Sequence, residues 1–153
     1  IRIHGDYHLG QVLVNGEDFY ILDFEGEPES TIRDRKVKQP PLKDVAGMFR
    51  SFHYAIYATI FNNKDKYPFE QKELFQAGEL LFKYFVGVFL QTYTEVAQAG
   101  NLNIGYRKEI DFLLKYCILE KAVYELGYEL NSRPRWAVIP LTGIASIMEF
   151  KDN

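Results

Sequence analysis

The sequence predicts a mostly helical α+β fold with one short β-hairpin near its N-terminus. From residue 42 onward, apolar residues recur every three or four positions, which is the spacing of one face of a helix. Before that point, two short apolar runs flank Asn15-Gly16, a pair typical of tight turns because both residues tolerate positive φ. The 153 residues, 47% of them hydrophobic, are enough to bury the core of one domain.

The first 41 residues predict a hairpin followed by a loop. The expected strands are Val12–Val14 and Phe19–Leu22, which are rich in β-branched and aromatic residues. Residues 25–41 contain Pro, Gly and a mixed cluster of charges. We therefore interpret them as an ordered but irregular loop.

Four helices are expected after this loop. The first begins at Pro41 and runs to at least Ile56; the others cover about residues 70–97, 107–130 and 140–150. The residues of the first helix expected to face inward are Leu42, Val45, Met48, Phe49, Phe52 and Ile56. In the second helix they are Leu74, Ala77, Leu81, Phe85, Val88 and Phe89. In the third they are Ile110, Leu113, Leu114, Cys117, Ile118 and Leu126.

Composition and charge exclude several classes of protein. The net charge of −3 and the lack of an evident basic face argue against a nucleic-acid partner. Lys83 and other polar residues interrupt the longest apolar runs, so no membrane span is expected. The single cysteine, Cys117, cannot form an internal disulfide, which indicates a reducing, cytoplasmic compartment. It lies in an apolar helical stretch, so we expect its thiol to be buried and inert. Because Ile1 leads directly into His4-Gly5-Asp6, we expect the chain to be a piece of a longer polypeptide.

Two segments carry residues suited to chemistry, His4–Gln11 and Leu22–Glu25. The hairpin between them would bring Asp6, Gln11 and Asp23 around one pocket. Phosphoryl transfer needs a carboxylate beside the acceptor hydroxyl and oxygen ligands for the magnesium ion on the nucleotide phosphates. We therefore expect Asp6 to orient or deprotonate the acceptor, and Gln11 and Asp23 to bind Mg²⁺ with ATP as co-substrate.

The pattern His-x-Asp followed by an amide five residues after the Asp, and then by Asp-Phe, resembles the catalytic and metal-binding motifs of protein kinases and aminoglycoside phosphotransferases. A closer resemblance is to bacterial maltokinases, which are often fused to trehalose synthase. Gln11 stands where the general pattern has Asn and resembles the maltokinase version. The stretches that carry the resemblance are HGDYHLGQVLV, YILDFEGEPE, KQPPLKDVAGMFRSFHYA and EKAVYELGYELNSRPRWAVIPLTGI.

This resemblance implies the C-terminal lobe of a protein-kinase-like fold, as a single-domain fragment. Residues 1–41 would hold the catalytic loop, hairpin, metal-binding segment and loop, and residues 42–153 the helical part. The implied function is ATP-dependent phosphorylation of maltose to maltose 1-phosphate in trehalose and α-glucan metabolism, with a trehalose synthase domain or subunit as partner. Nothing in the sequence resembles the Gly-rich loop and strand lysine of the N-terminal lobe, so the isolated chain is expected to be inactive.

Two other functions stay open at this point. One is a kinase for another small hydroxylated acceptor of the aminoglycoside or choline type. The other is a non-catalytic interaction module of a trehalose synthase, although the presence of Asp6, Gln11 and Asp23 together argues against lost activity.

Four further residues near these segments have two interpretations each. Glu25 could approach a second Mg²⁺ or lie in solvent, and His8 could face the acceptor sugar or be an ordinary loop residue. His4 could act as an acid or base, or it could support the loop by hydrogen bonding, which is the role we expect. Asp44 could stabilise a helix start through the helix dipole, or it could accept backbone N–H groups of the catalytic loop, as the kinase-like resemblance implies.

Three residues farther along the chain are possible substrate contacts. Arg33 and Lys36 belong to a basic cluster that could contact sugar hydroxyls or phosphate, or could be a solvated part of the loop. Trp136 could stack on a sugar face, or it could pack the C-terminal tail against the helices.

Overall fold

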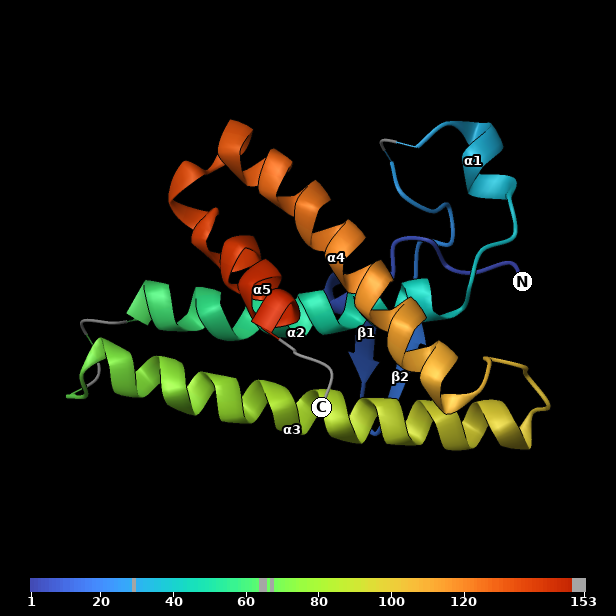
Figure 1. Ribbon diagram of the computed structural model, residues 1–153, viewed down its shortest axis with the longest axis horizontal. Coiled ribbons are helices and arrows are strands. Elements are labelled where there is room, and N and C mark those ends of the chain that lie inside the picture. Colours follow the sequence, from blue (N-terminus) through green and yellow to red (C-terminus); the bar gives the residue numbers. More distant parts are fainter. Residues whose placement is uncertain (29, 64–65, 67, 150–153) are drawn as a thin grey trace.

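Residues 1–28, 30–63, 66 and 68–149 are described by the computed structural model, which is mostly helical with one antiparallel hairpin (Figure 1). The elements in chain order are η1 (Leu9–Gln11), β1 (Val12–Asn15), β2 (Asp18–Ile21), α1 (Ile32–Lys36), α2 (Leu42–Asn63), α3 (Gln71–Ala99), α4 (Arg107–Ser132), η3 (Pro134–Trp136) and α5 (Val138–Glu149). The predicted α+β class is confirmed. None of the described helices combines the length and apolar character that a bilayer crossing needs.

Helix α2 is the central element, because it contacts α3, α4 and α5 (Figure 1). One core cluster joins its first half to α4, and the buried members are Leu42, Val45, Ala46, Phe49, Leu114 and Cys117. A second cluster joins its second half to α5, and the buried members are Ile56, Tyr57, Ile60 and Ile139. The inward faces predicted for the first and third helices are therefore confirmed, including the buried thiol of Cys117.

The prediction for α3 was partly wrong. Leu74 and Phe89 are partly buried, but the other four residues expected to face inward are exposed: Ala77, Leu81, Phe85 and Val88. The reason is that α3 packs mainly against α2, so only a narrow stripe of its surface is covered. Phe85 illustrates this, since its ring lies 5.7 Å from the ring of Phe52 while 39% of the residue stays exposed.

The N-terminal region also departs from the prediction in two places. The hairpin turn is formed by Gly16-Glu17, one residue later than the predicted Asn15-Gly16, because Asn15 pairs with Asp18. Gly16 has a φ of +64°, as expected for glycine at the first central position of a type II′ turn. The loop of residues 25–41 contains the short helix α1, whose N-cap Thr31 accepts a hydrogen bond from Asp34 N.

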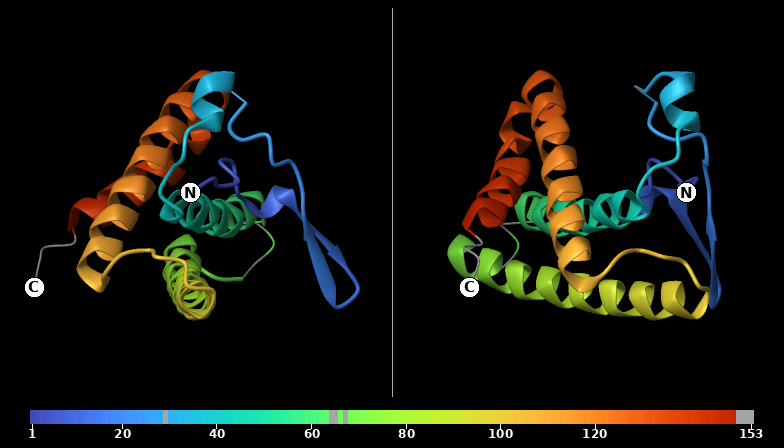
Figure 2. Two further views of the ribbon diagram at one scale, coloured as in Figure 1. Left: turned by 90° about the vertical axis from the view of Figure 1, so that its right-hand side faces the viewer. Right: turned by 45° about the vertical axis from the view of Figure 1, so that its right-hand side comes forward.

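Helix α5 begins at Val138, two residues before the predicted Pro140, and the predicted end at Phe150 lies outside the described residues. The hairpin stands clear of the helices (Figure 2), and most residues of both its strands are exposed. The base of the hairpin, however, joins the loop of residues 4–11, which lies against the start of α2. This junction positions the candidate site.

Candidate functional site

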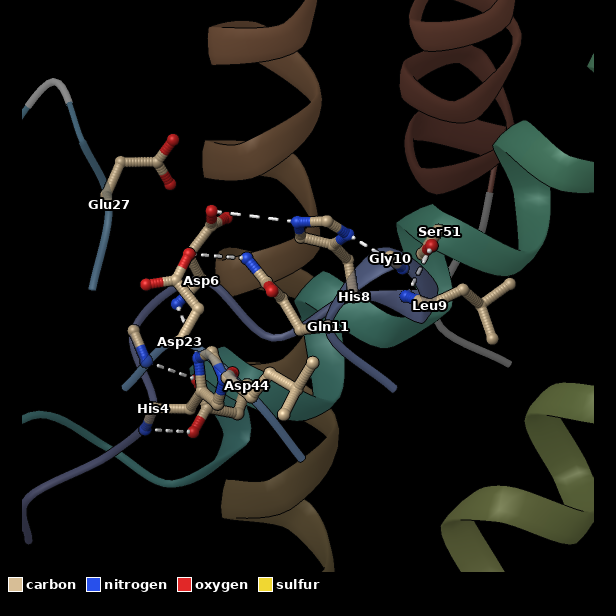
Figure 3. Close-up of polar contacts among 12 residues, drawn as sticks. His4, Asp6, His8, Leu9, Gly10, Gln11, Asp23, Glu27, Asp44 and Ser51 are labelled. Carbon is tan, nitrogen blue, oxygen red and sulfur yellow. Dashed lines mark hydrogen bonds and ion pairs between the residues drawn. The ribbon is translucent and has the colours of Figure 1, made fainter. Parts of the chain in front are cut away.

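The carboxylate of Asp44 holds the loop of residues 4–11, which we call the catalytic loop, against the first turn of α2. Asp44 Oδ2 accepts a hydrogen bond of 2.7 Å from His4 N, and Oδ1 accepts one of 2.9 Å from Gly5 N (Figure 3). Burial raises the pKa of Asp44, although both hydrogen bonds favour the ionised form. The side chain thus makes the contact expected of a loop brace, in addition to lying in the first turn of a helix.

His4 links this loop to the end of β2. Its Nδ1 accepts a hydrogen bond from Asp6 N (3.3 Å), so Nε2 carries the proton and donates to the carbonyl oxygen of Leu22 (2.7 Å). The ring is buried and lies 4.8 Å from the ring of Phe24. His4 therefore contacts the loop at Asp6 and the chain after β2 at Leu22, and its role as a support of the loop stays a prediction.

The hairpin brings Gln11 and Asp23 together. Leu22 N donates to the carbonyl oxygen of Gln11 (2.9 Å), which continues the strand pairing one step beyond β1 and β2. The next residue, Asp23, has a φ of 60°, in the left-handed region that non-glycine residues seldom adopt. In this conformation its Oδ2 accepts a hydrogen bond of 2.9 Å from Gln11 Nε2 (Figure 3).

Asp6 lies between a histidine and a lysine. Its Oδ2 is 3.7 Å from His8 Nε2, and its Oδ1 is 3.5 Å from Nζ of Lys121, a residue of α4. The same ammonium group is 2.7 Å from Oε2 of Glu27. The Asp6 side chain is mostly buried, with 16% of its surface exposed. Its carboxylate is therefore in contact with other side chains and is also accessible from solvent.

A cleft of about 330 Å³ opens beside Asp6, between the catalytic loop, described residues of the loop from Gly26 to Gln39, the start of α2, and α4. Its lining includes Gly5, Asp6, Glu27, Asp44, Lys121 and Tyr124. A volume of this size can hold a small molecule such as a monosaccharide. The cleft thus offers a small molecule a position next to the Asp6 carboxylate.

The donor atoms present suit a magnesium ion that is held partly by a nucleotide. Within the described part of the chain, no three His, Cys, Asp or Glu side chains gather closely enough to enclose a metal ion. Asp23 and Gln11 instead offer one carboxylate and one amide oxygen as donors, and in this structure Gln11 directs its amide nitrogen at Asp23. Mg²⁺ in nucleotide sites is commonly bound by one or two protein oxygens together with phosphates, so these residues fit it.

Glu25 is exposed, whereas Glu27, two residues later, contacts Lys121. Arg33 and Lys36 are exposed on α1, as expected of a solvated basic segment. Their neighbour Arg35 is half-buried and instead holds the loop, donating to the carbonyl oxygens of Ser30 (3.0 Å) and Pro28 (2.6 Å).

Trp136 packs against the second core cluster, at the second half of α2. One face of its indole is covered by the guanidinium of Arg133, 4.5 Å from the ring centroid. Of the two interpretations of this residue, packing of the tail is the one with observed contacts.

Two groups of charged residues were missed by the sequence analysis. One is the pair Lys121 and Glu27, which are 94 positions apart in the chain. The other is the buried pair of Arg50 and Glu125, with 2.8 Å between Nε and Oε2. Arg50, Lys121 and Glu125 lie in helical stretches that carry the resemblance, where the signal was a charge within an otherwise apolar pattern. Glu27 lies among other acidic residues in YILDFEGEPE, which gave no such signal.

No protein-family model matches the chain. It is 29% identical over 148 residues to a glucosamine kinase of Mycolicibacterium smegmatis, an alignment that covers 95% of this chain and 34% of that protein. It is 24% identical over 148 residues to a glucosamine kinase of Streptacidiphilus jiangxiensis, covering 97% of this chain and 32% of the relative. The chain thus spans about a third of the length of the curated relatives it matches.

Solved structures of glucosamine kinases also resemble this chain in fold. A glucosamine kinase crystal structure superposes with a TM-score of 0.78 at 22% identity, covering 95% of this chain and 33% of the other. A glucosamine kinase in complex with glucosamine, ADP and inorganic phosphate gives 0.72 at 23% identity, covering 95% and 34%. The fold is that of the C-terminal lobe of a kinase-like phosphotransferase, as the sequence predicted.

Proposed function

We propose that the chain is the C-terminal lobe of an ATP-dependent sugar kinase and that it acts as part of a longer parent polypeptide. The observation that carries this proposal is that Gln11 and Asp23 meet at the base of the hairpin, close to Asp6 in Figure 3, and that Asp6 lines a cleft. Likeness to glucosamine kinases over nearly the whole chain supports the same class of reaction. The expected complement is a nucleotide-binding lobe that covers the ATP phosphates from the opposite side.

In this proposal Asp6 accepts a hydrogen bond from the acceptor hydroxyl and takes its proton as the oxygen attacks the γ-phosphoryl group of ATP. The bond from the γ-phosphorus to the bridging oxygen breaks in the same transfer, and ADP leaves. Gln11 and Asp23 would hold Mg²⁺, which offsets the negative charge of the phosphates when bound. Asp44 and His4 keep the loop in place through the hydrogen bonds described above. Catalysis of this kind depends on position, so the bracing of the loop is part of the mechanism.

The acceptor is proposed to be a small sugar, and the comparisons favour an amino sugar. The two relatives described above are glucosamine kinases, whereas the sequence motifs alone resemble maltokinases. The lining of the cleft carries five carboxylates (Asp6, Glu27, Asp34, Asp44 and Glu120) and three cationic side chains (Arg35, Lys43 and Lys121). This excess of negative charge suits an acceptor that carries an ammonium group. Maltose, which is neutral, is the second candidate, and association with a trehalose synthase would follow only if maltose is the acceptor. A cytoplasmic location is proposed from the single buried cysteine.

A panel of acceptors tests the proposal. The parent polypeptide would be incubated with ATP, Mg²⁺ and one of glucosamine, maltose, glucose, an aminoglycoside or choline, and the phosphorylated product measured directly. We expect phosphate on a sugar, with glucosamine giving the highest kcat/KM. Turnover of maltose alone would restore the maltokinase assignment, and phosphorylation of none of the sugars would contradict a sugar kinase.

A further inference from the structure

Lys121 reaches from α4 to two segments that carry the proposed chemistry. Its ammonium group is 2.7 Å from Oε2 of Glu27 and 3.5 Å from Oδ1 of Asp6. The Lys121 side chain is 26% exposed, and the side chains of Glu27 and Asp6 are 23% and 16% exposed. Figure 3 shows the Glu27 side chain directed from its own segment toward Asp6 and α4.

We propose that Lys121 is a positioning residue that sets the orientation of the Asp6 carboxylate and joins the metal-binding segment to α4. This inference rests on the proposed function, because it assigns Lys121 a role in the same phosphoryl transfer. Lys121 is not proposed to contact the reacting atoms. It acts through Asp6 on one side and through Glu27 on the other.

The catalytic loop needs such a contact because its other restraints act on the backbone. Asp44 binds the backbone N–H groups of His4 and Gly5, and the Asp6 backbone N–H is bound by the His4 ring. None of these three hydrogen bonds reaches the Asp6 carboxylate. Among the described residues, Lys121 and His8 make charged contacts with that carboxylate.

Glu27 extends the effect of Lys121 to the metal-binding segment. Residues 23–27 lie directly on the catalytic loop, since a Cβ placed on Gly5 would be 3.1 Å from the Cα of Gly26. The salt bridge between Glu27 and Lys121 anchors the end of this segment to a long helix. Lys121 therefore fixes the position of Asp6 relative to the segment that begins with Asp23.

The local charges support a permanently protonated lysine. Burial alone would lower the pKa of Lys121, but the hydrogen bond and charge of Glu27, together with the charges of Asp6 and Glu125, raise it above its usual value. Without the ammonium group, the Asp6 and Glu27 carboxylates would face each other across a partly buried gap. Their repulsion would favour rotation of Asp6 away from the acceptor.

The test compares Lys121→Met with Lys121→Arg in the parent polypeptide. We expect Lys121→Met to lower kcat by about 30-fold or more, with the KM for ATP changed by less than about threefold, because misplacement of a catalytic group acts mainly on the chemical step. Lys121→Arg keeps a cation that can reach two carboxylates, and it should retain at least about a third of the wild-type kcat. Lys108→Met is the matched control, since Lys108 is an exposed lysine of the same helix.

The variant Glu27→Gln and the double variant Glu27→Gln/Lys121→Met complete a double-mutant cycle, in which the kcat values of all variants are compared with wild type. If the two side chains act as one unit, the double variant should be no slower than Lys121→Met alone. The inference is overturned if Lys121→Met keeps kcat within about twofold of wild type, or if the Arg and Met variants lose kcat equally while both stay folded by circular dichroism. A wild-type protein that phosphorylates no sugar would contradict the proposed function itself, and this outcome is read from the wild type before any variant is compared.

Discussion

Gly47 of α2 lies so close to the catalytic loop that a Cβ at this position would stand 2.7 Å from the carbonyl oxygen of Tyr7. Tyr7 is the residue directly after Asp6, so this approach sets the distance between α2 and the candidate catalytic carboxylate. Only glycine permits it without movement of the loop backbone.

Gly47→Ala is therefore expected to lower kcat by at least about tenfold, because the added methyl group pushes the loop away from α2. Alanine favours a helix interior by about 0.5–1 kcal/mol over glycine, so the melting temperature should fall little. The control is Gly87→Ala on α3, where a Cβ would meet nothing within 4 Å. That variant should be slightly more stable and fully active, and equal activity of the two variants would contradict the role given to Gly47.

Asp44→Ala is expected to destabilise the protein by about 1.5–3 kcal/mol, since it removes a charged acceptor from two backbone N–H groups. Urea unfolding would measure this change, and activity should fall with it because the loop loses its brace. Asp111→Ala, at an exposed position of α4, serves as the control and should be close to neutral. No change in either stability or activity for Asp44→Ala would leave only the helix-start interpretation.

His53 should make the stability of the protein depend on pH. It is buried, Arg50 Nη1 lies 3.2 Å from its Nδ1, and Glu79 Oε1 lies 4.0 Å from its Nε2. Burial, followed by the charge of Arg50, lowers the pKa of His53 from 6.5 to about 3. Between these two values the unfolded chain binds a proton that the folded chain does not, so stability is lost as the pH falls through this range.

The loss from this group should be about 2 kcal/mol between about pH 7 and pH 5. Unfolding curves would be measured at both pH values for wild type and for His53→Gln. The difference between the two proteins separates the contribution of His53 from that of other titrating groups. The variant should lose less stability than wild type over this interval. Equal losses in the two proteins would show that His53 is not kept neutral by the fold.

Asp23→Asn is expected to raise the Mg²⁺ concentration for half-maximal activity by at least about tenfold, because a charged oxygen ligand is replaced by a neutral one. Asparagine also tolerates the positive φ of this position, so the backbone should not change. Asp18→Asn, at the far end of the hairpin, is the matched control. An unchanged magnesium dependence would remove Asp23 from the proposed metal site.

The sequence predicted elements whose signals are local. The three- and four-residue spacing of Leu42, Val45 and Phe49 identified the buried face of α2, because these residues face one packed core. The same spacing overestimated burial at Leu81 and Val88, since periodicity shows which side of a helix is apolar but not whether another element covers it.

In the candidate site, as in the fold, the sequence predicted the contacts that form within one local segment. The meeting of Gln11 with Asp23 followed from the hairpin, whose register is set by a nearby turn. The turn itself lay one residue later than predicted, because Asn15 pairs as a strand residue. Lys121 could not be found in this way, since its contact with Asp6 spans 115 positions and depends on how α4 crosses the catalytic loop.

The central claim is that Asp6 is the carboxylate that acts on the acceptor, and the kcat of Asp6→Asn in the parent polypeptide tests it most directly. The substitution keeps the size of the side chain and removes its basicity, while Gln11 and Asp23 remain in place. We predict a kcat at least about 100-fold lower than wild type, with the affinity for ATP within about threefold when measured on the same preparation. A folded Asp6→Asn protein that turns over at a rate near wild type would contradict the account.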